Sequence, residues 1–529
     1  CKMVIRGNIF MSRYFFITIL LLTGEAFSAA RHLKIAAYDL NPYVSKDRAE
    51  HGYLYEIVIK TIELDNYSYD IEFMPPLRAR KMVESGEKDI LIPAYANPSK
   101  TDRLFFSQPI HGSEIGYIQL AKEKMPSEKE KRVIDADFYN YLNDDVVGEN
   151  ERFPSKEDEL ITDPSSKKIL SLIDMLSSKR IRLAVADKLQ VEDVLVNIRP
   201  NLIGKLKFIM PSLLTKSFNV AISRKNPEAR QILDDFSQSL DRLRKSGRYE
   251  KILMKYGYPI RNDDADEKSL SIGLVENSNT RIMMKLSQEF IKTHPVVTIR
   301  WFFLQENLLR RAILSGFALD NTLFDIISIG NYDAAIYAKN SWLEPLIPPP
   351  SYEKSDLLPS ILGSLSLKGV PYALPFYGES SMTYFRSDLF AKHGLKMPEH
   401  PTYHDIKAFA EQINDPKNGV YGICLRGKPG WGENMSFITT MVNVFGGSWF
   451  NKEKMPDLNS KKWLEAIQFY IDLLKKYGPP HSEENGYQEN LNLFANGHCG
   501  VWIDATVAGG YLLNPATSKV SASVKFSKA

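Results

Sequence analysis

Cysteine is scarce in this chain of 529 residues, which has only three, at positions 1, 424 and 499. So few cysteines exclude a scaffold held together by many disulfides. In an exported protein Cys424 and Cys499 can form one disulfide, whereas the alternative is two buried thiols. The spacing of the two residues leaves both alternatives open.

A surplus of one charge is also lacking, because 67 Lys and Arg side chains face 64 Asp and Glu side chains, for a formal net charge of +3. Nucleic-acid-binding proteins concentrate basic residues on one face, so this balance argues against that class. Hydrophobic residues make up 44% of the chain. The chain is therefore long and apolar enough for two or more globular domains.

Long apolar runs are absent after the first 30 residues, so the rest of the sequence predicts no membrane-spanning helix. Within 1–30, Met11 and the basic Arg13 precede a short apolar run at 14–22 and small residues at 28–30. This order is typical of a secretory signal peptide. An uncleaved anchor is the alternative, but the run is short for a bilayer. We therefore expect export.

Familiar catalytic signatures are missing too. The sequence has no phosphate-binding loop, dinucleotide fingerprint, nucleophile elbow or His-Glu-x-x-His motif. Its nine histidines are scattered without the spacing of metal ligands. The sequence therefore offers no catalytic residue, no metal site and no cofactor.

What the sequence does contain is one order of elements, strand-helix-strand-helix-strand, that occurs twice. Alternating hydrophobicity predicts the strands, and apolar residues at helical spacing predict the helices. The first copy has strands at 33–39, 69–73 and 89–92 and helices at 54–62 and 76–85; the second has strands at 269–276, 297–303 and 324–329 and helices at 282–290 and 307–315. This alternation predicts an α/β fold with parallel sheets covered by helices.

Two polar segments divide this pattern. Residues 260–268 are rich in Asp and Asn and predict a charged linker between two modules, 31–259 and 269–529. Residues 122–168 are dense in Lys, Glu and Asp, and we expect either a polar insertion between two lobes or an exposed helical excursion. Before the linker, Leu233, Phe236 and Leu240 predict a long amphipathic helix.

Several short motifs characterise the first module. They are Gly-Tyr-Leu-Tyr-Glu at 52–56, Arg-Ala at 78–79 with Gly86 and Asp89 downstream, and the closing runs at 219–223, 245–249 and 255–257. On these residues the module resembles the family 3 extracellular solute-binding proteins, which include receptors for polar amino acids. The resemblance implies two α/β lobes around a ligand cleft.

The ligand of the first module is less clear, because the receptors for amino acids hold the ligand carboxylate with an Arg shortly before a Phe-Ser pair. That pair is present at 106–107, but ungapped spacing puts Lys100 at the Arg position, and a three-residue deletion would put Arg103 there. A surface role for Arg103 is an equal alternative. The residues that we expect at a small polar ligand are Tyr38, Tyr43, Arg78, Lys100 and Arg103.

The second module carries more specific motifs. They are Phe-Asp-Ile at 324–326, Gly-Asn-Tyr-Asp at 330–333, Pro-Phe-Tyr-Gly-Glu-Ser-Ser at 375–381, Arg-Gly-Lys-Pro-Gly-Trp-Gly-Glu-Asn at 426–434 and Trp-Ile-Asp-Ala-Thr at 502–506. On these the module resembles family 1 extracellular solute-binding proteins, in particular the sorbitol/mannitol receptors of ABC importers. Relatives continue beyond the last motif, so we expect the second lobe to be incomplete in this sequence.

The residue types in these motifs suit a sugar alcohol, whose hydroxyls pair with carboxylates and amides and whose CH faces pack on aromatic rings. Strand ends and glycine-flanked loops are where open α/β sheets place ligands. The expected ligand residues are Asn331, Tyr332, Asp333, Glu379, Trp431, Glu433, Asn434, Tyr487, Trp502 and Asp504. For Arg386 we expect a structural role, either as a partner of Asp388 or at a helix end, and for Asp504 a helix cap is an equal alternative.

Together the resemblances imply two tandem modules of the type II periplasmic-binding-protein fold, located in the periplasm. They imply capture of a polyol or sugar, delivery to an ABC permease at the inner membrane, and no catalysis. One alternative is the sensing ectodomain of a truncated membrane receptor of the histidine kinase or cyclase type. A minor alternative is a fusion related to lytic transglycosylases, of which Gly-Glu-Ser-Ser at 378–381 is the only trace.

Overall fold

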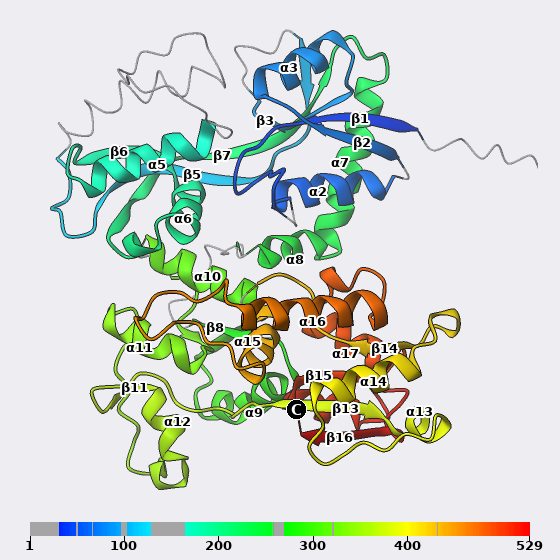
Figure 1. Ribbon diagram of the computed structural model, residues 1–529. Coiled ribbons are helices and arrows are strands. Elements are labelled where there is room, and N and C mark those ends of the chain that lie inside the picture. The colour runs from blue at the N-terminus through cyan, green and yellow to red at the C-terminus, as the bar shows by residue number, and fades with distance from the viewer. Residues whose placement is uncertain are drawn as a thin grey trace, which may run out of the picture. The chain divides into compact units, whose positions relative to one another are not determined.

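The computed structural model describes the chain in several stretches (Figure 1). These are residues 31–48, 51–65, 67–96, 103–127, 164–256, 258, 269–319, 322–430 and 432–528. The predicted signal peptide, the predicted linker and most of the predicted insertion lie outside these stretches. Among the helices of the described stretches, none combines the length and the apolar character that crossing a membrane requires.

Two compact units make up the structure. The first holds most of residues 31–252, and the second runs from Leu253 onward and includes the short pieces 119–123 and 192–208. Both contain strands and helices in alternation, which confirms the predicted α/β class.

The first unit is built on a sheet of seven strands in the order β2–β1–β3–β7–β5–β6, with β4 also paired to β7. The elements along this part of the chain are β1 (His32–Ala37), α2 (Tyr53–Glu63), β2 (Ser68–Phe73), α3 (Pro76–Ser85), β3 (Ile90–Ala94), β4 (Leu104–Phe106), β5 (Ile110–Leu120), α5 (Pro164–Ser177), β6 (Leu183–Asp187), α6 (Lys188–Asn197), β7 (Leu206–Ser223), α7 (Ala229–Lys245) and α8 (Arg248–Lys255). Strands β2, β1 and β3 are parallel, as predicted, and β7 is antiparallel to β3.

Helices α2 and α3 cover opposite faces of the parallel strands (Figure 1). Ala79 and Val83 of α3 pack on Ala36 and Leu91 of the sheet. Helix α3 ends at Gly86, which has a φ of 89°, a left-handed conformation that glycine adopts without steric cost. The predicted bounds of this helix are therefore confirmed at both ends.

Two long strands, β5 and β7, connect two lobes of the first unit (Figure 1). We call β1–β4 with α2, α3 and α7 its first lobe, and β6 with α5 and the first residues of α6 (188–191) its second lobe. The strands cross closely at Gly112, where a Cβ atom would lie 1.5 Å from the carbonyl oxygen of Lys216. Only glycine fits this crossing.

The second unit has a parallel sheet, β10–β8–β9, and a mixed sheet, β14–β15–β13–β16. Its main elements are β8 (Ser269–Val275), α9 (Ser278–Thr293), β9 (Thr298–Leu304), α10 (Glu306–Ala318), β10 (Ile326–Ile327), α11 (Asn331–Lys339), α12 (Pro359–Ser364), β11 (Ser366–Leu367), β12 (Val370–Pro371), β13 (Ser381–Arg386), α13 (Ser387–Lys392), α14 (Tyr403–Ile413), β14 (Tyr421–Cys424), α15 (Asn434–Val444), α16 (Lys461–Tyr477), α17 (Tyr487–Ala495), β15 (Cys499–Ala505), α18 (Gly509–Leu512) and β16 (Val524–Lys528).

The repeated order predicted for the second copy is present, with two corrections. Helix α10 continues through Gly316 to Ala318, because burial of this face against the core outweighs the low helix propensity of one glycine. The strand predicted at 324–329 is only the two residues Ile326 and Ile327.

Helix α9 forms where predicted, but its apolar stripe is not in a core. Ile282, Leu286 and Phe290 are 53%, 65% and 42% exposed. The periodicity therefore predicted the helix correctly, but it did not show what the apolar face contacts.

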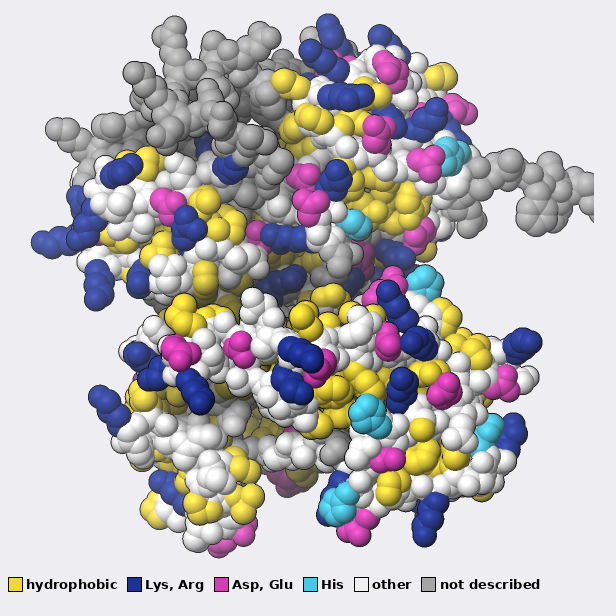
Figure 2. Space-filling model, viewed as in Figure 1, with side chains coloured by type: hydrophobic (Ala, Val, Ile, Leu, Met, Phe, Trp, Pro, Cys, Tyr) yellow, Lys and Arg dark blue, Asp and Glu magenta, His cyan; other side chains and the backbone are white. Residues whose placement is uncertain are grey.

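The mixed sheet separates two apolar cores. In β15, Val501 and Ile503 face one core with α14 and α16, and Trp502 faces the other with α17. Cys424 of β14 and Cys499 of β15 are joined by a disulfide with a Cα–Cα distance of 5.8 Å, so the disulfide is the alternative that the structure contains. On the face drawn in Figure 2, side chains of both charges are interspersed over the second unit.

Candidate functional site

A buried ion pair lies at one edge of the mixed sheet in the second unit. Strands β14 and β15 are parallel, with Cys424 opposite Trp502, so their carboxyl ends meet at the same edge. Arg426 follows two residues after Cys424, and Asp504 follows two residues after Trp502. The Nε and Nη2 atoms of Arg426 donate to the two Asp504 oxygens at 2.9 and 2.5 Å. This two-point contact fixes both groups.

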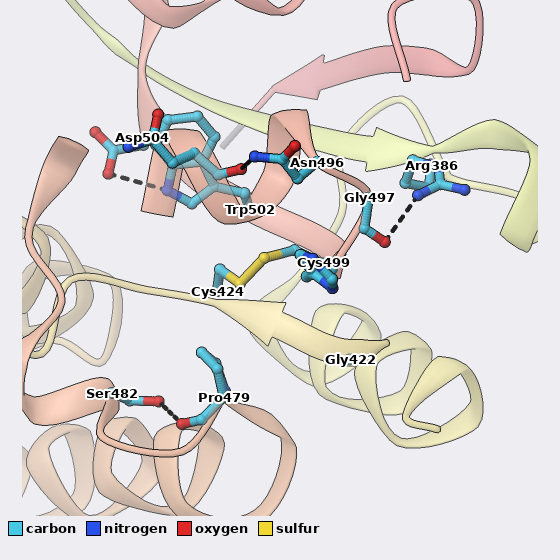
Figure 3. The surroundings of a disulfide bond; sticks show 12 residues. Arg386, Gly422, Cys424, Pro479, Ser482, Asn496, Gly497, Cys499, Trp502 and Asp504 are labelled. Carbon is cyan, nitrogen blue, oxygen red and sulfur yellow. Dashed lines mark hydrogen bonds between the residues drawn. A yellow bond between two sulfur atoms is a disulfide. The ribbon is translucent and has the colours of Figure 1, made fainter. Parts of the chain in front are cut away.

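Several donors besides Arg426 hold the Asp504 carboxylate. The indole N–H of Trp502 donates to Oδ2 at 3.1 Å (Figure 3). The backbone N–H of Ala505 donates to Oδ1 at 2.7 Å. Trp502 has no exposed surface and packs in the core behind the carboxylate. Asp504 lies within β15 and not at the start of a helix, so the alternative of a helix cap is wrong.

Residues 427–430 and 432–433 of the glycine-flanked motif follow Arg426 in the sequence. The carbonyl oxygen of Gly432 accepts a hydrogen bond from Nη1 of Arg426. Asn434 fixes the loop from within, because its Oδ1 accepts from the N–H of Gly430 at 3.2 Å and its Nδ2 donates to Gly427 at 3.4 Å. Asn434 therefore shapes the loop.

Glu433 connects this loop to α17. Its carboxylate accepts from the backbone N–H of Tyr487 at 3.3 Å, and a Cβ atom at Gly486 would lie 2.5 Å from it. Only 4% of Glu433 is exposed, and this burial raises the pKa of its carboxyl. The ring of Tyr487 lies 5.2 Å from the Arg426 guanidinium and 5.9 Å from the ring of Trp502.

Glu379 lies on the segment before β13, and charged groups of the same site shift the pKa of its carboxyl. Desolvation raises the pKa of its carboxyl to about 7, and Glu306 and Asp504 also raise it, while Arg426 lowers it. The backbone N–H of Val507 donates to this carboxyl. Glu379 therefore lies within electrostatic reach of residues from both sheets of the second unit.

The parallel sheet contributes the start of α10 to this group. Gln305 accepts a hydrogen bond from Nζ of Lys428 at 3.0 Å. A Cβ atom at Gly432 would lie 2.6 Å from the Glu306 carboxyl carbon, so the loop and the helix start are in close contact. We call Glu306, Glu379, Arg426, Glu433, Tyr487 and Asp504 the Arg426 cluster.

The motif at 331–333 begins α11 and lies beside this cluster. The hydroxyl of Tyr332 donates to Glu306 at 3.5 Å, and Tyr332 is 39% exposed. Asp333 is buried and pairs with Arg310 at 2.8 Å. Asn331 is the first residue of the helix. Asp333 thus anchors α11, and Tyr332 is the member of the motif that faces Glu306.

A small open hollow of about 230 Å³ lies beside Gly378. It is lined by Ser278, Asn279, Tyr377, Gly378, Thr506, Val507 and Gly510. The Tyr377 hydroxyl accepts from Nδ2 of Asn277 at 2.8 Å. A larger hollow of about 660 Å³ lies beside β13 and β16 but is lined by none of the expected ligand residues.

The structure therefore brings together Tyr332, Glu379, Glu433, Tyr487 and Asp504, and Trp502 supports them from the core. Trp431 lies outside the described residues. Sequence reasoning did not select Arg426, Glu306 or Lys428 as site residues, although Arg426 and Lys428 stand in the most specific motif. Arg386 pairs with Asp388 at 2.6 Å, as predicted, and donates to Gly497 at 3.1 Å (Figure 3).

The residues expected at the first module's ligand are dispersed. Tyr38 and Tyr43 are buried near the carboxyl ends of the parallel strands, whereas Arg78 is exposed on α3. Arg103 pairs with Glu84 at 3.4 Å and has a side chain that is 76% exposed. Its position before β4, which pairs Leu104 with Ser223, places it at the opposite edge of the sheet. Lys100 lies outside the described residues.

One comparison covers most of the second module. A sequence profile of bacterial extracellular solute-binding proteins matches residues 276–526. A mannitol-binding protein from Pseudomonas aeruginosa PAO1 is 45% identical over 260 residues, which are 49% of this chain and 60% of that protein.

Two solved structures are also similar. An ABC-transporter solute-binding protein from Agrobacterium vitis S4 with bound D-mannitol is 45% identical, with a TM-score of 0.48 over 49% of this chain and 63% of that one. One from Agrobacterium radiobacter K84 in complex with ribitol is 23% identical, with a TM-score of 0.45 over 50% and 67%. The chain spans less than two thirds of the two relatives at 45% identity.

Proposed function

We propose that this protein is the substrate-binding component of an ABC importer and that its second module captures a sugar alcohol or a related carbohydrate. The observation that carries the proposal is the Arg426 cluster, in which carboxylates, a guanidinium and aromatic rings converge at one edge of the mixed sheet. The match to solute-binding proteins and the 45% identity to a mannitol-binding protein support it.

The chemistry of the cluster suits a polyol. Carboxylates accept the hydrogen bonds that hydroxyls donate; the Glu433 carboxyl is buried, whereas the Glu379 side chain is exposed. An aromatic ring such as Tyr487 covers a CH face. Micromolar capture requires about 8 kcal/mol in total, which a few hydrogen bonds to charged groups and one packed ring supply.

We propose further that the first module binds a small polar solute and that neither module catalyses a reaction. In this proposal the segment 1–30 directs export to the periplasm, and closure of the lobes on the ligand presents a surface to the inner-membrane permease. The resemblance of the first module to family 3 binding proteins supports its part of the proposal.

Isothermal titration calorimetry of the full chain with D-mannitol, sorbitol, arabitol and ribitol tests the polyol proposal. We expect saturable binding of at least one polyol and a loss of about tenfold or more in affinity for Asp504→Asn, because the two-point contact with Arg426 is disturbed. Asp388→Asn is the matched control, since it alters an Arg–Asp pair outside the cluster. Folded protein that binds none of these polyols and no sugar would refute the proposal.

A further inference from the structure

Glu379 occupies a position that backbone pairing in the second unit defines. Strands β13 and β15 are antiparallel. Beyond their paired residues, the backbone N–H of Thr506 donates to the carbonyl oxygen of Ser380 at 2.9 Å, and the Thr506 hydroxyl accepts from the N–H of Ser380 at 3.3 Å. The backbone N–H of Val507 donates to the Glu379 carboxyl. Glu379 therefore lies one residue beyond this pairing, and its side chain is exposed.

The open hollow of about 230 Å³ lies at the same place. Gly378, which precedes Glu379, and Val507, which bonds its carboxyl, both line this hollow. Tyr377 lines it too, and its hydroxyl accepts from Asn277. A solute in the hollow therefore lies next to the backbone that carries Glu379.

The two cations at this site already donate hydrogen bonds within the protein. Arg426 donates from Nε and Nη2 to Asp504, and from Nη1 to the carbonyl oxygen of Gly432. Nζ of Lys428 donates to Gln305 at 3.0 Å. The site therefore offers few free donors to a solute.

Carboxyl groups outnumber these cations. Four of the six residues of the Arg426 cluster carry a carboxyl group and one carries a guanidinium, while Lys428 adds the second cation. Desolvation raises the pKa of the Glu379 carboxyl to about 7, Arg426 lowers it, and the charges of Glu306 and Asp504 raise it. Glu379 therefore keeps its proton more readily than an ordinary glutamate does.

Three phenols also face Glu379, from its own segment, from β13 and from α17. Desolvation and nearby carboxylates, Glu379 among them, raise the pKa of Tyr377 and Tyr384 to about 12 and that of Tyr487 still higher. All three phenols stay protonated near neutral pH, so they contribute no change of charge there.

The hydrogen bonds of a polyol explain why a neutral carboxyl is useful at this place. Each hydroxyl group of the solute both donates and accepts. Ionised carboxylates only accept, so a site with many of them and few free donors leaves hydroxyl oxygens unpaired, at a cost in affinity. A protonated carboxyl supplies an O–H donor and keeps an acceptor. Closure on an uncharged solute also removes water, which favours the neutral form of a carboxyl group.

We propose that Glu379 holds a polyol as a neutral carboxyl group, donating its O–H to a hydroxyl oxygen of the solute, so that capture at alkaline pH takes up one proton. The proton comes from the solvent and returns to it when the solute leaves. This inference rests on the proposed function of the second module and adds how protons regulate it. Affinity should level off below neutral pH and fall about tenfold per pH unit once the free site has lost the proton.

Isothermal titration calorimetry of the full chain with D-mannitol, or with whichever polyol of the panel above binds more tightly, measures the proton uptake. The titration is run at about pH 8 in phosphate and in Tris buffer, because a proton drawn from the buffer adds the ionisation enthalpy of that buffer to the heat of binding. This enthalpy is small for phosphate and large for Tris. We expect binding to be less exothermic in Tris, by the enthalpy of close to one proton, and about tenfold weaker at about pH 8 than at about pH 6.

Glu379→Gln tests the residue assignment, because an amide keeps an N–H donor and cannot ionise. This variant should bind the polyol with similar affinity at the two pH values and with the same enthalpy in the two buffers. Glu465→Gln is the matched control, since Glu465 pairs with Lys461 and Lys462 on α16, outside the cluster. Its pH dependence should equal that of the parent chain. Circular dichroism checks that both variants are folded.

Equal binding enthalpies in the two buffers, or a proton uptake that persists in Glu379→Gln, would overturn the inference and leave polyol capture standing. A folded parent chain that binds no polyol and no sugar would instead refute the proposed function, and the inference with it. The two failures are therefore distinguishable.

Discussion

Arg426 and Asp504 face each other two residues beyond Cys424 and Trp502, the last paired residues of two parallel strands. The register of β14 and β15 therefore decides that the two charged groups meet, although 78 positions separate them in the sequence. A shift of the register by one residue would turn one of the two side chains to the other face of the sheet. The ion pair and the register thus require each other.

Asp504→Ala tests how much this ion pair contributes to the stability of the second unit. The variant leaves the Arg426 guanidinium buried without its carboxylate, which costs about 3 kcal/mol of stability. All six tryptophans lie between residues 301 and 502, so tryptophan fluorescence during urea unfolding reports on the second unit. Asp388→Ala, in a more exposed pair, should cost less than about 1 kcal/mol. Equal losses in the two variants would contradict the assigned role.

The pKa of Glu379 predicts how stability depends on pH. It lies at about 7 in the folded chain against an ordinary value of 4.5, so the folded protein binds more protons than the unfolded protein between these values. Stability of the second unit should therefore fall as the pH rises through this window. The contribution should be about 1 kcal/mol, since the side chain is exposed and screened by solvent.

Glu379→Gln provides the check on this dependence. The variant cannot ionise, so urea midpoints measured from about pH 5 to about pH 8 should decline less than those of the parent chain. We expect the variant to be the more stable protein at the alkaline end. A parent and a variant with parallel profiles would show that another group is responsible.

The disulfide predicts a large dependence on reduction. It closes a loop with a sequence separation of 75, for which the chain-entropy relation gives about 4 kcal/mol of stabilisation. Both cysteines are fully buried, so a reductant should act only when the second unit opens. Urea unfolding with and without dithiothreitol measures the effect, and a chain with Cys424→Ala and Cys499→Ala should not respond to the reductant.

Gly112→Ala should be the most harmful small substitution in the first unit. Its methyl group would meet the backbone of Lys216, which cannot rotate away as a side chain can. We expect a loss of about 3 kcal/mol or more, visible in thermal melts by circular dichroism. Gly86→Ala is the comparison: nothing lies within 4 Å of its new methyl group, and only the positive φ opposes it, at a cost of about 1 kcal/mol. A milder effect at Gly112 than at Gly86 would contradict the close crossing.

The sequence predicted those elements whose ends and faces are set locally. The helix at 76–85 has a proline at its start and a glycine at its end, and both signals act within one turn of the helix. Apolar residues at helical spacing located α7, and Leu233, Phe236 and Leu240 are all buried in it. Gly316 misled the prediction because packing of α10 overrides a local signal.

Long-range partners were beyond what the sequence could show. The spacing of Ile282, Leu286 and Phe290 indicates a helix, but no local pattern states whether its stripe is covered. Arg426 was not predicted as a site residue, because its partner, the Asp504 carboxylate, comes from a strand that is distant in the sequence. Arg386 and Asp388, two positions apart, were paired correctly for the opposite reason.

The covalent link between β14 and β15 also has a mechanical consequence. If the chain were pulled from its two ends, the segment between Cys424 and Cys499 would remain a closed ring and would bear no tension. With a separation of 75 residues, about 250 Å of chain inside the ring cannot be extended until the disulfide is reduced. Glu433 and Tyr487 lie inside that ring, and Asp504 lies outside it, so force would part Arg426 from Asp504 without extending the ring.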